Sequence, residues 1–176
     1  MRAAEKKETV LVVLIFISAI LLCLWYSSRH TDIIRINPDQ QTILADNDFI
    51  ISSPTGSLIV GKSTRDEVKK IYPEGKDLGK SGVYRPSNQD LLLSFSRKEN
   101  ILIKMDIGNC DLSTSRGIKV NDSFDKVVEK YGPNYTRAYD KDKPQIFDAF
   151  YGSDKYILFK VDNNVVTKII IGSPII

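Results

Sequence analysis

The hydrophobic pattern begins with one long apolar run. From residue 10 to residue 26 the chain reads VLVVLIFISAILLCLWY, without a charged residue. A helix that crosses the hydrocarbon of a bilayer needs about 17 to 25 such residues, so we predict a transmembrane helix, a signal anchor, over residues 9–27. The preceding stretch, predicted as a cytoplasmic stub at 1–8, holds three basic residues, Arg2, Lys6 and Lys7. A removed signal peptide and a buried core helix stay open as alternatives.

Two later stretches predict helices with the same layout, GKSTRDEVKKIYP at 61–73 and NDSFDKVVEKYGP at 121–133. In the first, Thr64 and Glu67 have the spacing of a capping box, and an apolar face follows at Val68, Ile71 and Tyr72. In the second, the predicted cap is Asn121 or Asp122, and the apolar face is Phe124, Val127, Val128 and Tyr131. A proline stops each helix, because it lacks the backbone N–H that a helix needs.

After each helix the apolar positions change to a period of two, which predicts strands. One predicted hairpin consists of LLLSFS, the turn RKEN and ILIKMDI, and a second consists of YILFKV, the turn DNN and VVTKIII. Two further strands are predicted at IFDAFYG and SGVYR. We therefore predict the α+β class: an N-terminal transmembrane helix plus two tandem repeats, each a helix followed by an antiparallel β-meander. Repeat 1 is expected at 57–112 and repeat 2 at 113–176. Residues 28–56 are predicted as a stalk or, alternatively, as an extra edge strand.

The twofold pattern resembles the tandem-repeat domain of β-lactamase inhibitor proteins. It is also similar to outer-membrane assembly lipoproteins of the small-protein-A kind and to related extracytoplasmic proteins of Gram-positive bacteria. The residues that carry the resemblance in the first copy are Val60, Gly61, Ser63, Val68, Tyr72 and Pro73. Those in the second are Ile118, Val120, Asp122, Ser123, Val128, Tyr131, Gly132 and Pro133.

The resemblance implies a protein that binds another protein through its sheet, rather than an enzyme. Asn121 stands where such repeats often carry glycine, and asparagine is the next best residue for a positive backbone torsion. The paired cysteines of the inhibitor are missing from this chain, so β-lactamase inhibition itself is not carried over.

Charge and cysteine content narrow the function classes. From Thr31 onward 21 Lys and Arg stand against 20 Asp and Glu, interspersed along the chain. Such a balance provides no field that attracts nucleic acid. The two cysteines are Cys23, in the apolar run, and Cys110, so no intrachain disulfide is expected.

Candidate catalytic and metal-binding residues are sparse. The single histidine, His30, lies in the predicted stalk without a rigid partner. Asp140, Asp142 and Asp148 lack the glycine and the terminal glutamate of a calcium loop. We therefore predict no catalytic residue, no metal and no cofactor, with an enzyme that uses a pair of carboxylates as the alternative.

One face of the second sheet is the strongest candidate for binding. One set of residues is expected to face the helix: Ile157, Phe159, Thr167, Ile169 and Ile171. Because side chains alternate along a strand, a second set then faces the other side. That set is Tyr156, Leu158, Lys160, Val166, Lys168 and Ile170. Its counterpart in the first unit is Leu92, Leu102, Lys104 and Asp106. Exposed apolar patches mark recognition sites, although the face is also open to being covered by another part of the chain.

These observations predict a membrane-anchored, extracytoplasmic module of the bacterial cell envelope that binds a partner protein without enzymatic activity. The expected location is the cell membrane, with a single pass and contact with the bilayer through residues 9–27. Two alternatives remain: an envelope enzyme with a carboxylate pair, and a structural or sensory ectodomain that forms a homodimer through the same sheet.

Overall fold

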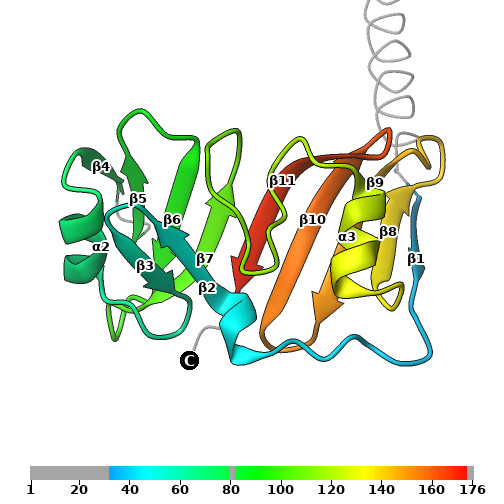
Figure 1. Cartoon of the computed structure of the whole chain (residues 1–176), viewed down its shortest axis with the longest axis horizontal. Helices are drawn as coiled ribbons and strands as arrows, with labels where there is room; N and C mark the ends of the chain where they lie inside the picture. Colours follow the sequence, from blue (N-terminus) through cyan, green and yellow to red (C-terminus); the bar gives the residue numbers. More distant parts are fainter. Residues whose placement is uncertain (1–31, 80–81, 174–176) are drawn as a thin grey trace, which may run out of the picture. The chain divides into compact units, whose positions relative to one another are not determined.

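A nine-stranded antiparallel sheet forms the centre of the protein. The structure is a computed structural model that describes residues 32–79 and 82–173. Across the sheet the strands run in the order β1-β8-β9-β10-β11-β7-β6-β5-β4 (Figure 1). Their bounds are β1 Ile33–Ile36, β4 Gly75–Leu78, β5 Val83–Pro86, β6 Leu91–Phe95, β7 Leu102–Ile107, β8 Thr136–Asp140, β9 Ile146–Gly152, β10 Tyr156–Asp162 and β11 Val165–Gly172.

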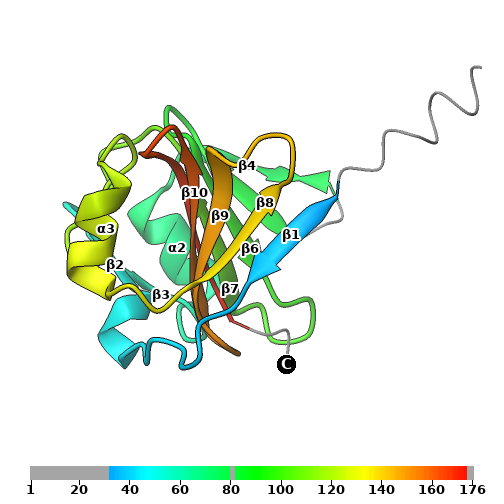
Figure 2. The same cartoon turned by 90° about the vertical axis from the view of Figure 1, so that its right-hand side faces the viewer.

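Two short helices cover one face of this sheet. They are α2 at Arg65–Ile71 and α3 at Phe124–Tyr131. The 3-10 helix η1, Asp46–Phe49, and the separate hairpin of β2, Ile50–Ser53, and β3, Gly56–Ile59, lie on the same side (Figure 2). The other face carries no described helix or hairpin, and we call it the open face.

The helix caps follow from the sequence in one case and differ from the prediction in the other. Thr64 caps α2, and its backbone N–H donates to Glu67 at 2.8 Å while the Glu67 amide donates to the Thr64 hydroxyl at 3.3 Å. Ser123, rather than Asn121 or Asp122, caps α3 by accepting from the amide of Lys126. Asn121 instead takes the positive φ, 75°, that its place in the pattern predicts.

The predicted class, α+β with an N-terminal transmembrane helix and two tandem helix-and-meander repeats, is wrong. The described chain is mostly β, with α-helices of only seven and eight residues. The strands of the two halves are not separate layers, because β7 pairs with β11 and makes one continuous sheet. Met105 lies opposite Ile171 in that pairing, and both side chains are fully buried.

The prediction of a single-pass membrane protein is corrected as well. Within the described residues, no helix combines the length and the apolar character needed to cross a membrane. The segment 9–27, on which the signal anchor, the bilayer contact and the cell-membrane location were based, lies outside the described residues, as does the stub at 1–8. None of these predictions is carried further.

The segment predicted as a stalk contacts the rest of the protein at several points between residues 32 and 56. Strand β1 pairs with β8 at one edge, as the alternative of an extra edge strand predicts. The chain then passes to the helix-covered side, where Thr42 donates its backbone N–H to the carbonyl of Asn134 at 3.2 Å. Phe49 and Ile51 are buried in the core.

A buried ion pair ties this segment to the loop that precedes α3. The carboxylate of Asp48 in η1 is 3% exposed and lies 2.6 Å from Nη2 of Arg116. Ser115 and the backbone amide of Ala45 also donate to it, at 3.2 and 2.8 Å. Burial alone would raise the pKa of Asp48, but the hydrogen bonds from Arg116 and Ala45 outweigh it and hold the pKa below its ordinary value. The carboxylate is therefore charged and fully partnered in the folded protein.

Candidate recognition surface

Strands β10 and β11 place most of the predicted binding residues on the open face. Leu158 lies opposite Ile170, and Lys160 lies opposite Lys168. Tyr156 lies opposite Gly172 on the same face. All five side chains are half-buried, and Figure 2 shows both helices on the other side of the sheet. The intervening residues, Ile157, Phe159, Ile169 and Ile171, are fully buried beneath the helices, as predicted.

Val166 does not belong to this surface, because a β-bulge interrupts the alternation. Lys160 pairs with Lys168 and Val161 pairs with Val166, so Thr167 is an extra residue in β11. Val166 therefore turns into the core, where it is 0% exposed, and Thr167 turns to solvent and donates to the carbonyl of Lys160 at 3.1 Å. The expectation that Thr167 faces the helix is corrected for the same reason.

The same irregularity occurs in the first half. Ser94 pairs with Lys104 and Phe95 pairs with Leu102, which leaves Ile103 as the extra residue of β7. Leu102 is consequently 0% exposed, whereas the sequence predicts it on the outer face. The bulge does not affect the face of Leu92, Lys104 and Asp106. These residues lie on the side of the bulge where the pairing is regular, so they stay on the predicted face.

An apolar stripe runs across β9, β10 and β11 on the open face. We define the apolar stripe as Phe150, Tyr156, Leu158 and Ile170. Leu158 lies between Phe150 on one side and Ile170 on the other. The rings of Phe150 and Tyr156 are stacked, with centroids 4.9 Å apart and planes at 22°. Sequence reasoning missed Phe150, although its place two residues from Asp148 in an alternating strand would have put it there.

Glycine at position 172 makes room for the aromatic end of the stripe. A Cβ atom built on Gly172 would lie 2.5 Å from Cζ of Tyr156, so the ring lies flat over the backbone of β11. The side chain is thus held against the sheet by the glycine and by the stacked Phe150. A rigid aromatic side chain that is fixed before binding loses little entropy when a partner docks on it.

Charged residues border the stripe, and two pairs of like charges face each other. Lys160 contacts both oxygens of Asp148 at 3.1 Å, while Lys168 lies directly opposite Lys160. At the other end of the sheet, Lys76 of the edge strand β4 lies opposite Arg85 of β5. Like charges directly opposite one another destabilise a sheet. The sequence therefore retains positive charge on this face at some cost in stability.

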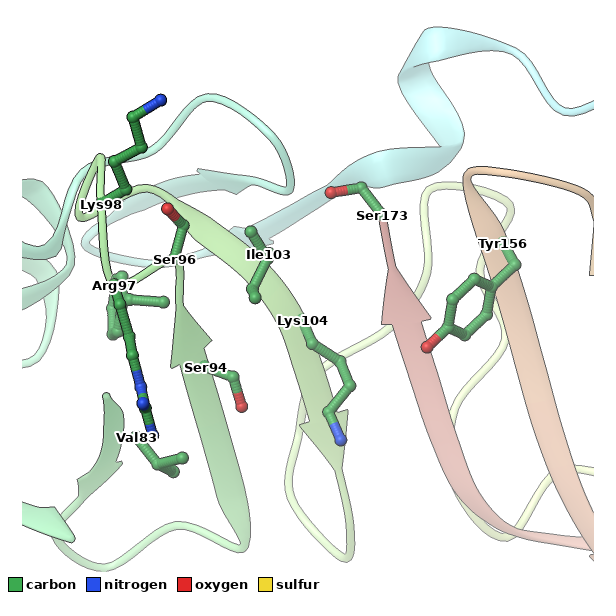
Figure 3. Close-up of a pocket in the computed structure, with 10 residues that line it drawn as sticks. Val83, Ser94, Ser96, Arg97, Lys98, Ile103, Lys104, Tyr156 and Ser173 are labelled. Carbon is green, nitrogen blue, oxygen red and sulfur yellow. The ribbon is translucent and has the colours of Figure 1, made fainter. Parts of the chain in front are cut away.

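A hollow in the described surface lies next to the stripe. It is a pocket of about 660 Å³, and we call it the basic pocket. Its lining residues are Val83, Ser94, Phe95, Ser96, Arg97, Lys98, Ile103, Lys104, Tyr156 and Ser173. Figure 3 shows Arg97 extending along the pocket toward Val83, with Ser94 next to it and Lys104 farther across the pocket. Tyr156 belongs to both the pocket and the apolar stripe, so the two features adjoin.

The described carboxylates give no support to acid and base catalysis. Three lie on the central strands of the open face. Asp106 is paired with Lys104 at 3.0 Å and Asp148 with Lys160 at 3.1 Å. Asp162, at the end of β10, accepts a hydrogen bond from the side-chain amide of Asn163 at 2.8 Å. Where the pKa of a described carboxylate is shifted, the shift is downward. This holds for Asp48, Asp77, Asp111, Asp122 and Glu129. A general acid at neutral pH needs a raised carboxyl pKa.

The other candidate groups lie apart from the surface. In the described ranges, no three acidic, histidine or cysteine side chains cluster as metal ligands. His30 is outside those ranges. Cys110 is half-buried beside the core, and burial raises the pKa of its thiol.

Comparison with known proteins adds no relative: no family model, no curated protein and no solved structure matches the chain. The resemblance to β-lactamase inhibitor proteins and to small-protein-A-like proteins stays a hypothesis.

Proposed function

We propose that this chain is a non-enzymatic binding or assembly module that recognises a partner protein through the open face of its sheet. The observation that carries the proposal is the apolar stripe, formed by half-buried aromatic and aliphatic side chains that no described element covers. Apolar patches with a charged border are typical of protein interaction sites.

The scaffold behind the stripe supports the same function. The strands that present it are the longest of the sheet, and the side chains on their opposite faces are buried in the core. Phe159, for example, lies between Leu158 and Lys160 in sequence and packs with Tyr131 of α3 at 5.3 Å between ring centroids. A rigid core on one side fixes the positions of the side chains on the other. The open face thus presents a preformed surface to a partner.

The first prediction is a pattern of photo-cross-linking in cells that produce the protein. A photoreactive amino acid in place of Leu158 or Ile170 is expected to give an adduct with the same discrete protein. The matched control is Glu129, which is exposed on α3 on the helix-covered side. No such adduct is expected from that position, because a partner bound to the open face does not reach it.

Three outcomes decide the proposal. The proposal is supported if the photoreactive residue gives the same adduct from position 158 and from position 170. Each adduct should be lost when the other of these two positions carries aspartate. An adduct of the chain with itself would show instead that the open face forms a homodimer. Adducts from Glu129 alone, with none from the two open-face positions, would contradict the proposal.

A further inference from the structure

The basic pocket combines positive charge with apolar walls. Three cations, Arg97, Lys98 and Lys104, line it, and no carboxylate does. Within the described structure Arg97 and Lys98 form no ion pair, while Lys104 contacts Asp106 at 3.0 Å and keeps 40% of its side chain exposed. In Figure 3 Lys98 points away from Ser94, whereas Lys104 points along the pocket. The groups that an occupant would meet are therefore the guanidinium of Arg97 and the ammonium of Lys104.

Positive charge also extends from the pocket to the sheet edge. Lys76 and Arg85 face each other on the open side of β4 and β5. The part of the open face formed by strands β4 to β7 carries three cations, these two and Lys104, but only one carboxylate, Asp106. The chain from Thr31 onward is nearly neutral. This concentration of cations is thus local, and it favours an anionic group on whatever docks there.

We propose that the basic pocket binds an acidic side chain of the partner protein, and that the same partner segment places an apolar side chain on the apolar stripe. This inference rests on the proposed function, since it concerns how the open face selects its partner. A carboxylate in the pocket accepts hydrogen bonds from Arg97 and Lys104, and the hydroxyls of Ser94 and Tyr156 line the same space.

The walls of the pocket favour a protein over a nucleic acid. Val83, Ile103 and the ring of Tyr156 supply apolar surface beside the cations. A nucleic-acid site needs a track of cations that follows many phosphates, whereas this pocket of about 660 Å³ is the size of a site for one or a few side chains.

The sheet also sets the spacing of the two anchors in the partner. Lys104 is on β7 and Leu158 is on β10, with β11 between them. Lys104 is level with Tyr156 across the sheet, so Leu158 is offset from it by two residues along the strands. Two strand spacings of about 4.8 Å together with this offset place the two positions about 12 Å apart. An extended segment advances about 3.3 Å per residue, so we expect the acidic residue about three to four positions from the apolar residue.

A pair of synthetic peptides tests the inference on the full chain. The probe is a peptide of about ten residues that consists mostly of glycine and serine, so it is flexible. It carries one glutamate, a leucine three positions along from it and a phenylalanine at the next position. Its match has glutamine in place of the glutamate. Fluorescence anisotropy is expected to show binding of the glutamate peptide at least about fivefold tighter than that of the glutamine peptide. The preference should shrink as salt rises from about 0.05 M to about 0.5 M.

Matched charge variants locate the effect. Arg97→Gln with Lys104→Gln is expected to abolish the preference for glutamate. The control variant, Lys62→Gln with Lys70→Gln, removes the same amount of charge from exposed positions at a separate hollow on the helix-covered side. This control should keep the preference for the glutamate peptide. A preference that survives the first pair, or that both pairs abolish equally, would overturn the inference. Tighter binding of a single-stranded oligonucleotide or of phosphatidylglycerol vesicles than of the peptide, lost with the first pair, would overturn it too.

The two proposals fail separately. If aspartate at Leu158 abolishes binding of the cross-linked partner while the Arg97 and Lys104 variant binds it normally, the open face is the binding surface but the pocket does not select a carboxylate. If adducts form from Glu129 alone, the proposed function itself is wrong, whatever the peptides show.

Discussion

A variant with methionine in place of Arg116 is expected to lose about 3 to 5 kcal/mol of its free energy of unfolding, because it leaves a buried carboxylate without a cation. That carboxylate is Asp48, which accepts from Nε and Nη2 of Arg116 at 2.7 and 2.6 Å. The guanidinium also lies 4.4 Å from the centre of the Tyr131 ring and donates to the carbonyl of Lys130. Urea denaturation measures the loss.

A double variant provides the control for this prediction. Asp48→Asn combined with Arg116→Met removes the charge together with its partner, so it is expected to recover part of the stability that Arg116→Met alone loses. A loss of less than about 1 kcal/mol in the single variant would mean that water reaches Asp48 and that the pair is no more than a surface ion pair.

The pair also predicts the direction of a pH effect. The folded pKa of Asp48 lies below its ordinary value of 3.8. The stabilisation is therefore complete above that value and is lost as pH falls through the folded pKa, since the unfolded chain binds the proton first. The wild-type protein should lose stability below about pH 4 more steeply than Asp48→Asn does. Equal slopes would contradict the lowered pKa.

Truncation of Phe159 to alanine is expected to cost about 3 to 5 kcal/mol, because its ring fills the core between the sheet and α3. The side chain is 0% exposed, with its centroid 5.3 Å from that of Tyr131 and 5.9 Å from that of Tyr151. Chemical denaturation of the purified variant gives the value directly.

The neighbouring residue is the matched control, since it lies on the same strand and points the other way. Leu158→Ala is expected to cost about 1 kcal/mol or less, as it loses only cross-strand contacts with Phe150 and Ile170. Losses of similar size for Phe159 and Leu158 would show that the open face is covered in the folded protein and would remove the basis of the proposed function.

Local patterns predicted the local structure well. The period of two located the hairpins of β6 with β7 and β10 with β11, because alternating side chains are what a sheet with one buried face requires. The spacing of Thr64 and Glu67 predicted the capping box at the start of α2. Asn121, which stands where the resembling repeats often carry glycine, has a positive φ of 75°.

Three kinds of feature were not readable from the sequence. The bulges at Thr167 and Ile103 shift the alternation by one residue, so counting by two placed Val166 and Leu102 on the wrong face. Pairing of β7 with β11 joins residues far apart in the chain and depends on tertiary packing rather than on any local period. The polar strands β4 and β8 were missed because they show no clean alternation of apolar residues.

The candidate surface was predicted in part for the same reasons. Five of the six proposed contact residues lie on the open face, since they precede the bulge in β10 or follow it in β11. Phe150, the glycine under Tyr156 and the basic pocket depend on which strands become neighbours, which only the assembled sheet reveals.

The affinity of the cross-linked partner for an Ile170→Asp variant of the full chain tests the central claim most directly. Titration calorimetry should show binding weakened by at least about tenfold, because a charge in the middle of the apolar stripe must be desolvated when the partner docks. The exposed Glu129→Gln variant should bind as the wild type does. Unchanged affinity of Ile170→Asp, with its stability intact, would show that the partner binds elsewhere and that the open face is not the recognition surface.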